Sequence, residues 1–347
     1  MVTSNRETTG FLLSVVFVCL AAGRDVYFGA LFQRVDPLTV ALTAFTLCTL
    51  VFLPVALATD RGGLARLRRH ARTLAWINAT SAIAWLSFFH ALRMGEPALV
   101  QVIFFGIGPL SVTWIDRLVP GAAPAARTLG ERRLHAGLLA SLLVAVAVML
   151  GGWSGLGAQP LGRVLAGVAL TVGGGIAISV STLLSRKVND GGVRPATLIA
   201  VRFPGAVMLA AALAALSPAR VAHDLTPAVL GLVAAASLLL IVLPNYVNQV
   251  GIALASPLTV RAVLAVGPVL VFLLQLLEGR LPSSPFTLAA CVLYAVFALA
   301  SAAARRHAIR TMPGALGYGS RSLMAMRAAG AGSGETNASG PNRSTVA

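Results

Sequence analysis

Long apolar runs separated by short polar turns fill the chain between residues 11 and 304. A helix of about 20 apolar residues spans the hydrocarbon core of a bilayer. The runs are continuously apolar rather than alternating, which favours helices over barrel strands because backbone polar groups in lipid must be satisfied within the segment. The pattern predicts an all-α integral membrane protein with ten transmembrane helices, near residues 11–32, 38–58, 74–92, 97–118, 134–152, 162–184, 195–217, 226–248, 258–277 and 284–304.

The turns between these runs leave no space for a soluble domain, since the longest of them, residues 119–133, has 15 residues. Residues 1–10 are predicted to form a cytoplasmic N-terminus, followed by a first five-helix repeat over 11–152 and a second over 162–304. Residues 305–347 are rich in Gly, Ala and Ser and have no apolar period, which is typical of a disordered tail. We expect this tail on the cytoplasmic side.

Composition agrees with a lipid environment, because 57% of residues are hydrophobic and only 11% are charged. A soluble enzyme and a soluble DNA-binding module are both excluded by these values. The net charge of +16 is a topology signal, since sixteen Lys and Arg residues fall in the terminal segments and turns on the N-terminal side and five fall on the opposite side. Cytoplasmic loops carry such an excess, so both termini are predicted to be cytoplasmic, in an inner or plasma membrane. The expected partners are membrane lipids and a small-molecule substrate, without nucleic acid.

The two halves of the chain resemble each other weakly. FFHALRMGEPALVQVIFFGIGPL at 88–110 and VGIALASPLTVRAVLAVGPVL at 250–270 both leave one span through Ala-Leu, cross a turn that contains a proline, and approach a Gly-Pro pair. FQRVDPLTV at 32–40 likewise parallels SRKVNDGGVRPATL at 185–198. Five helices is an odd number, so the second half must enter the membrane from the opposite side. Inverted repeats of this kind are typical of secondary transporters.

These landmarks, together with LLEGRL at 276–281, resemble the EamA-type transporters of the drug/metabolite transporter superfamily, over roughly residues 11–304. The resemblance implies a ten-helix, five-plus-five carrier of small solutes, with export as the leading direction. Arg202, seven residues after Pro195, is placed like the arginine often found early in the second helix of each half of that family. The first half departs from the pattern, because Ala44 stands seven residues after Pro37.

Charged residues within a span are costly, so each invites a functional interpretation. Arg24 and Asp25 lie about 20 Å from the start of the first helix, at about 1.5 Å rise per residue. Adjacent side chains project about 100° apart, so the two are not expected to face each other. We predict that one of them faces a central cavity and engages substrate or a proton; pairing with a neighbouring helix is the structural alternative. Arg202 and Arg261 are shallower, and a structural role is favoured for both.

Further substrate-binding candidates are polar or aromatic groups in spans. Trp85 and Gln101 lie within the third and fourth spans, where Trp85 can stack on a planar substrate or pack in the core. Asn245, Tyr246 and Gln249 follow Pro244 on less than two turns at the end of the eighth span. Asn245 and Gln249 are four residues apart and share a face. An ordinary polar helix end is the competing interpretation.

Asp25 and His90 are the candidate proton relay, and Glu96, in the turn that follows, is expected to be solvated. Pro109 and Pro268 occupy matching places in the two halves and are candidate gating kinks. Gly173, Gly174 and Gly175 are expected to permit close helix approach or local unwinding.

No metal site, cofactor or disulfide framework is expected, because the three cysteines fall inside apolar spans and no nucleotide, zinc or nucleophile motif occurs. We therefore predict a secondary active transporter that exports a small organic metabolite or drug and is not an enzyme. The alternative is an integral membrane enzyme acting on a lipid or small molecule, which should gather His, Asp, Glu or Arg at one interface; here the acids are scattered along the sequence. A scaffold is a third hypothesis, and a homodimer is compatible with the first.

Overall fold

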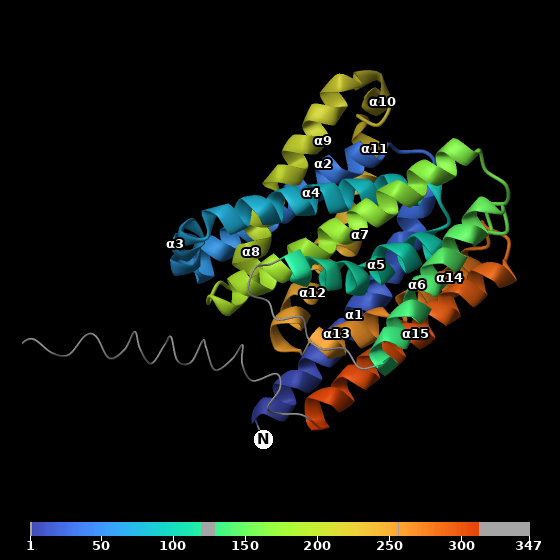
Figure 1. Ribbon diagram of the computed structural model, residues 1–347. Helices are drawn as coiled ribbons and strands as arrows, with labels where there is room; N and C mark the ends of the chain where they lie inside the picture. Colours follow the sequence, from blue (N-terminus) through green and yellow to red (C-terminus); the bar gives the residue numbers. More distant parts are fainter. Residues whose placement is uncertain (1, 119–128, 256, 312–347) are drawn as a thin grey trace, which may run out of the picture. The chain divides into compact units, whose positions relative to one another are not determined.

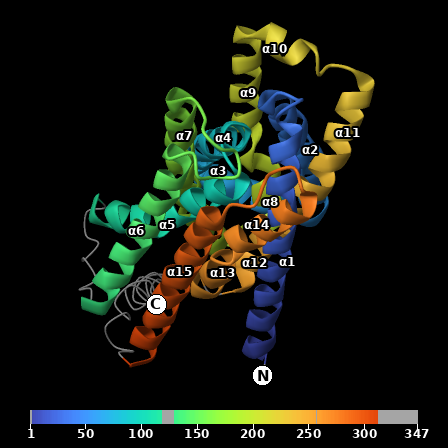
Figure 2. The same ribbon diagram turned by 90° about the vertical axis from the view of Figure 1, so that its right-hand side faces the viewer.

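The computed structural model describes residues 2–118, 129–255 and 257–311. Within them it contains helices and turns and no strand, and residues Met1–Ala302 form one compact unit. The helices (Figures 1 and 2) are α1 (Val2–Leu31), α2 (Pro37–Thr59), α3 (Arg61–Arg69), α4 (Ala71–Met94), α5 (Pro97–Leu118), α6 (Leu129–Leu150), α7 (Leu161–Asp190), α8 (Pro195–Arg202), α9 (Pro204–Leu216), α10 (Pro218–Ala222), α11 (Pro227–Ser237), a π-helical turn η1 (Leu238–Val242), α12 (Leu243–Leu254), α13 (Pro257–Leu264), α14 (Gly267–Glu278) and α15 (Pro285–Thr311).

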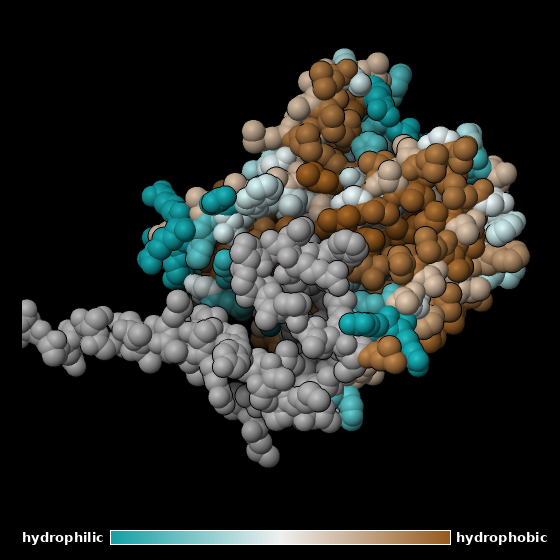
Figure 3. Space-filling model, in the orientation of Figure 1, coloured by the Kyte–Doolittle hydropathy of each residue, from teal (hydrophilic) through white to brown (hydrophobic). Residues whose placement is uncertain are grey.

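Within this described part, seven helical segments are long and apolar enough to cross a membrane: Glu7–Leu31, Pro37–Thr59, Arg132–Leu150, Leu161–Asp190, Pro195–Leu216, Pro227–Leu254 and Pro285–Ala304. Large apolar side chains on them point outward, among them Met208, Leu216 and Leu239. In Figure 3 hydrophobic surface covers much of α7 and α9, whereas the arginine-rich α3 is hydrophilic. A water-facing surface of this kind would be costly, so the chain is a multi-pass membrane protein.

At two predicted spans the helix extends beyond the membrane-length segment, which is Glu7–Leu31 in one and Pro285–Ala304 in the other. The N-terminal segment is already helical from Val2, and α15 continues through Thr311 rather than ending at residue 304. In both places a helix extends past the apolar run into polar residues, because the backbone hydrogen bonds of a helix do not require apolar side chains. The turn at 119–128, the tail from residue 312 and the side chain of Arg261 lie outside the described residues.

Three of the predicted spans are interrupted by prolines. Pro204 lacks an N–H group, and the segment 195–216 is divided into α8 and α9 at Phe203. Pro268 occupies the first turn of α14, after a two-residue break that follows α13. Pro244 follows η1, where the Leu243 N–H donates to Leu238, one residue further back than in an α-helix. Pro204 and Pro244 lie within membrane-length apolar segments, and Pro268 lies in the shorter apolar segment Ala262–Glu278.

Buried apolar side chains form two main clusters, each of which combines helices from both parts of the sequence. One joins α2 and α4 to α8, α9, α11 and η1. The other joins α5 and α6 to α14 and α15. Figure 2 shows α2 between α9 and α11, in agreement with their contacts. The core therefore does not divide between the first and the second half of the chain.

The predicted close approach at the helix α7 glycines is confirmed. A Cβ on Gly175 would lie 2.5 Å from the Phe104 carbonyl oxygen of α5, and one on Gly174 would lie 3.2 Å from the Ala84 carbonyl oxygen of α4. Gly173 has open space instead. Helix α7 can lie this close to α4 and α5 because the contacting positions have no side chain.

Candidate functional site

Arg24 and Asp25 form a buried ion pair in the interior of α1. The Nε–H group of Arg24 donates to Oδ1 of Asp25 at 2.7 Å, and neither side chain is more than 3% exposed. The expectation that these neighbours do not face each other is wrong. Their Cα–Cβ bonds diverge, but the long arginine side chain bends back to reach the carboxylate. The pair is electrically neutral as a unit.

Two further candidates extend this pair. Gln101 of α5 donates from Nε2 to Oδ2 of Asp25 at 2.9 Å, while its Oε1 atom is buried without a hydrogen-bond partner among the described residues. The guanidinium carbon of Arg24 lies 5.1 Å from the centroid of the Trp85 ring on α4. Four predicted residues, Arg24, Asp25, Trp85 and Gln101, thus form one connected group from three helices.

The other three substrate-binding candidates lie on α12, and no hydrogen bond between described residues joins them to the Arg24 group. Asn245 donates from Nδ2 to the Ile241 carbonyl oxygen of η1 at 2.9 Å. Tyr246 is 40% exposed and stacks on Phe52. Gln249 is buried, and both its amide atoms lack a partner. Asn245 and Gln249 share the buried face as predicted.

Arg202, at the end of α8, lies among hydroxyl groups. Its Nε donates to Ser81 Oγ of α4 at 2.9 Å and its Nη2 to Ser181 Oγ of α7 at 3.0 Å. The two hydroxyl oxygens are 2.8 Å apart. Asn78, one turn before Ser81, spans the break between α8 and α9 by donating to the Val201 carbonyl oxygen and accepting from the Gly205 N–H group. Polar side chains of α4 therefore hold the interrupted helix.

A carboxylate at the end of α2 caps the start of α8. We call the end of the helix bundle at which α2 ends the near end, and the end at which α2 begins the far end. Asp60, Arg66, Arg194 and Thr197 form the near-end cap. Oδ2 of Asp60 accepts from the Thr197 hydroxyl at 2.8 Å and from the Arg194 N–H at 3.3 Å. Oδ1 accepts from Arg66 at 2.9 Å and from the Gly63 N–H at 3.0 Å. Burial raises the pKa of Asp60, but these donors and the charge of Arg66 outweigh it and hold the pKa below its ordinary value.

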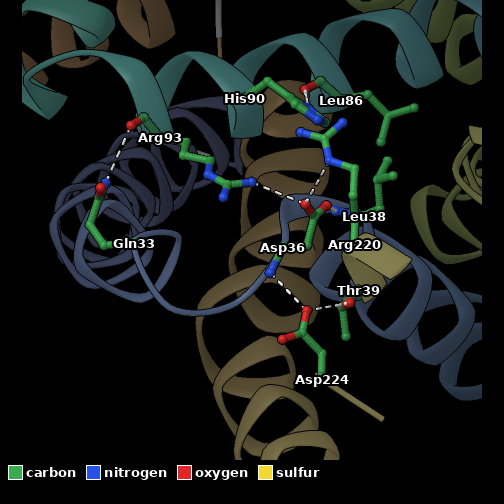
Figure 4. Close-up of polar contacts among 9 residues, drawn as sticks. All are labelled: Gln33, Asp36, Leu38, Thr39, Leu86, His90, Arg93, Arg220 and Asp224. Atoms are coloured by element: carbon green, nitrogen blue, oxygen red, sulfur yellow. Dashed lines mark hydrogen bonds and ion pairs between the residues drawn. The ribbon is translucent and has the colours of Figure 1, made fainter. Parts of the chain in front are cut away.

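A second carboxylate, after α10, caps the start of α2. We call Asp36, Thr39, Arg93, Arg220 and Asp224 the far-end cap (Figure 4). Oδ2 of Asp224 accepts from the Asp36 N–H and from the Thr39 hydroxyl, both at 2.8 Å. The Asp36 carboxylate accepts from the Leu38 N–H and pairs with Arg93 at 3.0 Å and Arg220 at 3.7 Å.

The two caps make the same hydrogen bonds at corresponding positions of the segments 32–40 and 185–198, which resemble each other in sequence. Asp36-Pro-Leu-Thr39 begins α2 and Arg194-Pro-Ala-Thr197 begins α8. In each case a distant aspartate accepts from the first backbone N–H and from the threonine hydroxyl. Each aspartate follows the second helical segment of the opposite half, so the caps are reciprocal.

Glu96 is not solvated, contrary to prediction, but is 1% exposed. Its carboxylate accepts from the Gly155 N–H at 2.8 Å, the Thr287 hydroxyl at 2.9 Å and the Gln275 amide at 3.0 Å. Gln275 in turn accepts from the Ala98 N–H. The turn is buried because the segment before α7 and the start of α15 close over it. Burial raises the pKa of Glu96, with its three hydrogen bonds acting in the opposite direction.

The remaining candidates are placed as follows. Nδ1 of His90 lies 2.9 Å from the Leu86 carbonyl oxygen, in the region of the far-end cap (Figure 4). Pro109 lies inside the continuous α5, whereas Pro268 starts α14, so the two do not form matching kinks. The described residues contain no group of three or more His, Cys, Asp or Glu able to hold a metal ion.

Sequence reasoning did not identify the caps or the Arg202 group as sites. Ser181 and the two capping aspartates were not singled out. The helix starts that the aspartates cap are 134 to 188 residues away in sequence, and Arg202 is 21 residues from Ser181. The one available signal was the match of DPLT with RPAT, which marks the two helix starts but not their acceptors.

No family model and no curated protein matches the chain. A crystal structure, described only as that of a protein, has a TM-score of 0.58 over 88% of this chain and 98% of its own. The two sequences are 20% identical, so the likeness concerns the fold alone.

Proposed function

We propose that the chain is a secondary active transporter that moves a small organic solute by alternating access between two inverted five-helix halves. The halves are 11–152 and 162–304, with ten crossings. The observation that carries this proposal is the reciprocal pair of caps. Asp60 at one end and Asp224 at the other make the same bonds to corresponding helix starts, as expected for two halves that enter the membrane from opposite sides.

The mixed core supports the same arrangement. Helices α2 and α4 of the first half pack with α8, α9, α11 and η1 of the second, and α5 and α6 pack with α14 and α15. Each cluster thus contains helices from matching positions of the two halves. We propose that the two clusters move relative to each other. Such a shift opens one end while the other stays closed.

Interrupted helices and unpaired polar atoms at membrane depth support a solute site. Transporters place solute sites at breaks in membrane helices, and this chain has such breaks at Phe203 and Val266. Trp85 Nε1, Gln101 Oε1 and the Gln249 amide are buried without partners among the described residues. Buried polar atoms ordinarily have partners, so these suit a solute that supplies them.

The enzyme alternative gains one observation, because Asp36, Arg93, Arg220 and Asp224 gather at one end although they are scattered in sequence. Their polar groups, however, are engaged in caps and ion pairs. The cluster also has a counterpart at the opposite end, which a single catalytic interface does not require. We therefore prefer transport.

Family, direction and orientation are part of the proposal. Membership of the EamA-type drug/metabolite transporters rests on the Ala-Leu, Gly-Pro and LLEGRL landmarks, and export rests on that resemblance alone. The excess of Arg and Lys supports a cytoplasmic location for both termini, and with it a cytoplasmic position for the near-end cap.

The test is counterflow uptake of a labelled metabolite panel into liposomes that contain the purified protein. Uptake of at least one solute above that of empty liposomes is expected. Failure of a broad panel, with protein inserted and folded, would contradict transport. An imposed pH gradient tests the coupling assigned to Asp25 and His90, since flux that ignores the gradient would reject proton coupling.

A further inference from the structure

Arg202 is a buried cation without an anion. Its side chain is 4% exposed, and none of the ion pairs in the described part of the chain includes it. The other buried arginine, Arg24, is neutralised by Asp25 within the same helix. The interior between α4, α7 and α8 therefore carries one uncompensated positive charge.

This charge cannot be removed by deprotonation, because a guanidinium remains protonated in proteins. A buried carboxyl such as that of Glu96 can instead become neutral by binding a proton. An unpaired charge at membrane depth is costly. Arg202 consequently retains a strong attraction for any anion that reaches it.

Its two hydroxyl partners leave donor capacity free. A guanidinium has five N–H bonds in a planar fork that matches a carboxylate. The structure shows two bonds from Arg202, to Ser81 and Ser181. A hydroxyl both donates and accepts. One of the two serines donates to the other, so the serine that accepts in that bond keeps its own hydrogen and can donate it to an anion while both remain bonded to Arg202.

Unpartnered polar groups continue from this site toward the near end along α7. Ser185 and Asn189 follow Ser181 at four-residue intervals and so share its face. The hydroxyl oxygen of Ser185 and both amide atoms of Asn189 are buried without a hydrogen-bond partner in the described part of the structure. Polar atoms that line a solute path would be left unpaired in this way when the path is empty.

Aromatic side chains adjoin the site. The guanidinium carbon of Arg202 lies 5.6 Å from the centroid of the Phe203 ring, and that ring stacks on Phe45 at 4.8 Å. Phe45 also contacts Trp85, whose indole N–H is unpartnered. These neighbours suit an apolar or aromatic body attached to the anionic group.

We propose that Arg202, Ser81 and Ser181 bind the carboxylate of a small organic acid with an apolar body, which reaches them along Ser185 and Asn189. This assignment deepens the proposed transport function and rests on it for its biological meaning. The binding itself does not require transport, so the two can be tested separately.

The test is equilibrium dialysis of labelled benzoate and hexanoate against the full-length protein in detergent at pH 7, with empty micelles as the blank. Benzamide and hexanamide are the neutral counterparts. The acids are expected to bind at least tenfold more tightly than their amides, since a hydrogen bond to a charged group is worth about one to two powers of ten in affinity.

Three variants connect binding to the site. Arg202→Gln should weaken benzoate binding about a hundredfold and Arg202→Lys about tenfold, because lysine keeps the charge but loses the planar fork. Ser181→Ala should weaken it several-fold. The matched control is Arg186→Gln, which removes an exposed charge from the same end of α7 and should change nothing.

Equal binding of acid and amide, no binding of either acid, or unchanged binding by Arg202→Gln would overturn the assignment. If Arg202→Gln does not fold, the benzoate affinities of Arg202→Lys and Ser181→Ala serve as the test. Wild-type affinity in both variants would overturn the assignment. Arg202-dependent binding without counterflow in liposomes would leave the site standing and reject transport. Counterflow confined to amines or neutral solutes would support transport and reject the carboxylate site.

Discussion

The near-end and far-end caps perform the same task with different distributions of charge. At the near end one carboxylate, Asp60, accepts four hydrogen bonds, from the start of α8, from α3 and from Arg66. At the far end two carboxylates divide the work, with Asp224 capping α2 and Asp36 holding Arg93 and Arg220. Reciprocal function therefore does not require identical chemistry.

This difference in charge implies that the near-end cap and the far-end cap resist opening unequally. Loss of Asp60 removes the four hydrogen bonds to its carboxylate at once and leaves only the bond from Arg194 to the Thr59 carbonyl oxygen, whereas loss of Asp224 leaves the Asp36 ion pairs in place. Both caps are closed in this structure. If alternating access operates as proposed, opening an end breaks its cap and leaves the other intact.

The largest expected effect is that of removing the capping carboxylates. Asp60→Ala should lower the free energy of unfolding by about 3 kcal/mol and Asp224→Ala by about half as much, because Asp60 has more donors to leave unpaired. Denaturant unfolding in detergent measures both. Asp190→Asn is the control, since Asp190 is 73% exposed and should be neutral. An equal or larger effect at Asp224 would refute the unequal caps.

The threonines test the equivalence of the two helix starts. Thr197→Val and Thr39→Val each remove one hydroxyl donor to a buried carboxylate and should each cost about 1.5 kcal/mol. Thr43→Val, which loses only a bond to its own helix, should cost less. Clearly different losses for the first two would contradict the correspondence of DPLT with RPAT.

The two ends should respond oppositely to pH through Asp60 and Glu96. Because the pKa of Asp60 is depressed, its stabilising contribution is present above the ordinary pKa and is lost as the pH falls through the depressed value. The pKa of Glu96 is raised, so its contribution is complete at low pH and is lost as the pH rises through the raised value.

Melting of the Asp60→Asn variant from about pH 2 to pH 8, and of the Glu96→Gln variant from about pH 4 to pH 8, measures this opposition, because the depressed pKa of Asp60 lies below pH 4. The destabilisation by Asp60→Asn should be larger at pH 8, whereas Glu96→Gln should be relatively more stable at pH 8 than at pH 4. We expect differences of about 1 kcal/mol across the range. The same pH trend in both variants would contradict the assignment.

The smallest effect concerns the arginines of the far-end cap. Arg93 is 36% exposed and 3.0 Å from Asp36, and Arg220 is 55% exposed and 3.7 Å away. Arg93→Gln should cost up to about 1 kcal/mol and Arg220→Gln less, since exposed ion pairs contribute little. Raising the salt concentration should reduce the difference. A larger loss for Arg220→Gln would show that distance and exposure do not rank these pairs.

Much of the helical framework was predictable from apolar runs alone. The segment 97–118 coincides with α5, and most other boundaries differ by a few residues. The break at Phe203 was not predicted, and the interruption beside Pro268 was predicted only as a kink, because Pro204 and Pro268 follow apolar runs that continue on both sides. A proline in such a run either bends a helix, as the position of Pro109 allows, or ends one, and packing decides which.

The sequence predicted which polar residues lie inside the spans, but it did not predict which side chains they contact. Insertion cost identified Arg24, Asp25 and Arg202, and polarity identified Gln101. Their partners depend on how helices pack, as the bond between Gln101 and Asp25 shows across 76 residues. Glu96 was misplaced for the same reason, since only the folded chain brings Gly155 and Thr287 over its turn.

The most direct test of reciprocal caps is a pair of spin-label distances in liposomes, in a Cys19→Ser background. Labels at Arg61 and Lys187 report on the near end, and labels at Arg34 and Ala222 report on the far end; all four positions are exposed. With Asp60→Asn the near-end distance should lengthen or broaden while the far-end distance stays unchanged, and Asp224→Asn should give the reverse. Two ends that always loosen together, or do not respond, would contradict alternating access by reciprocal caps.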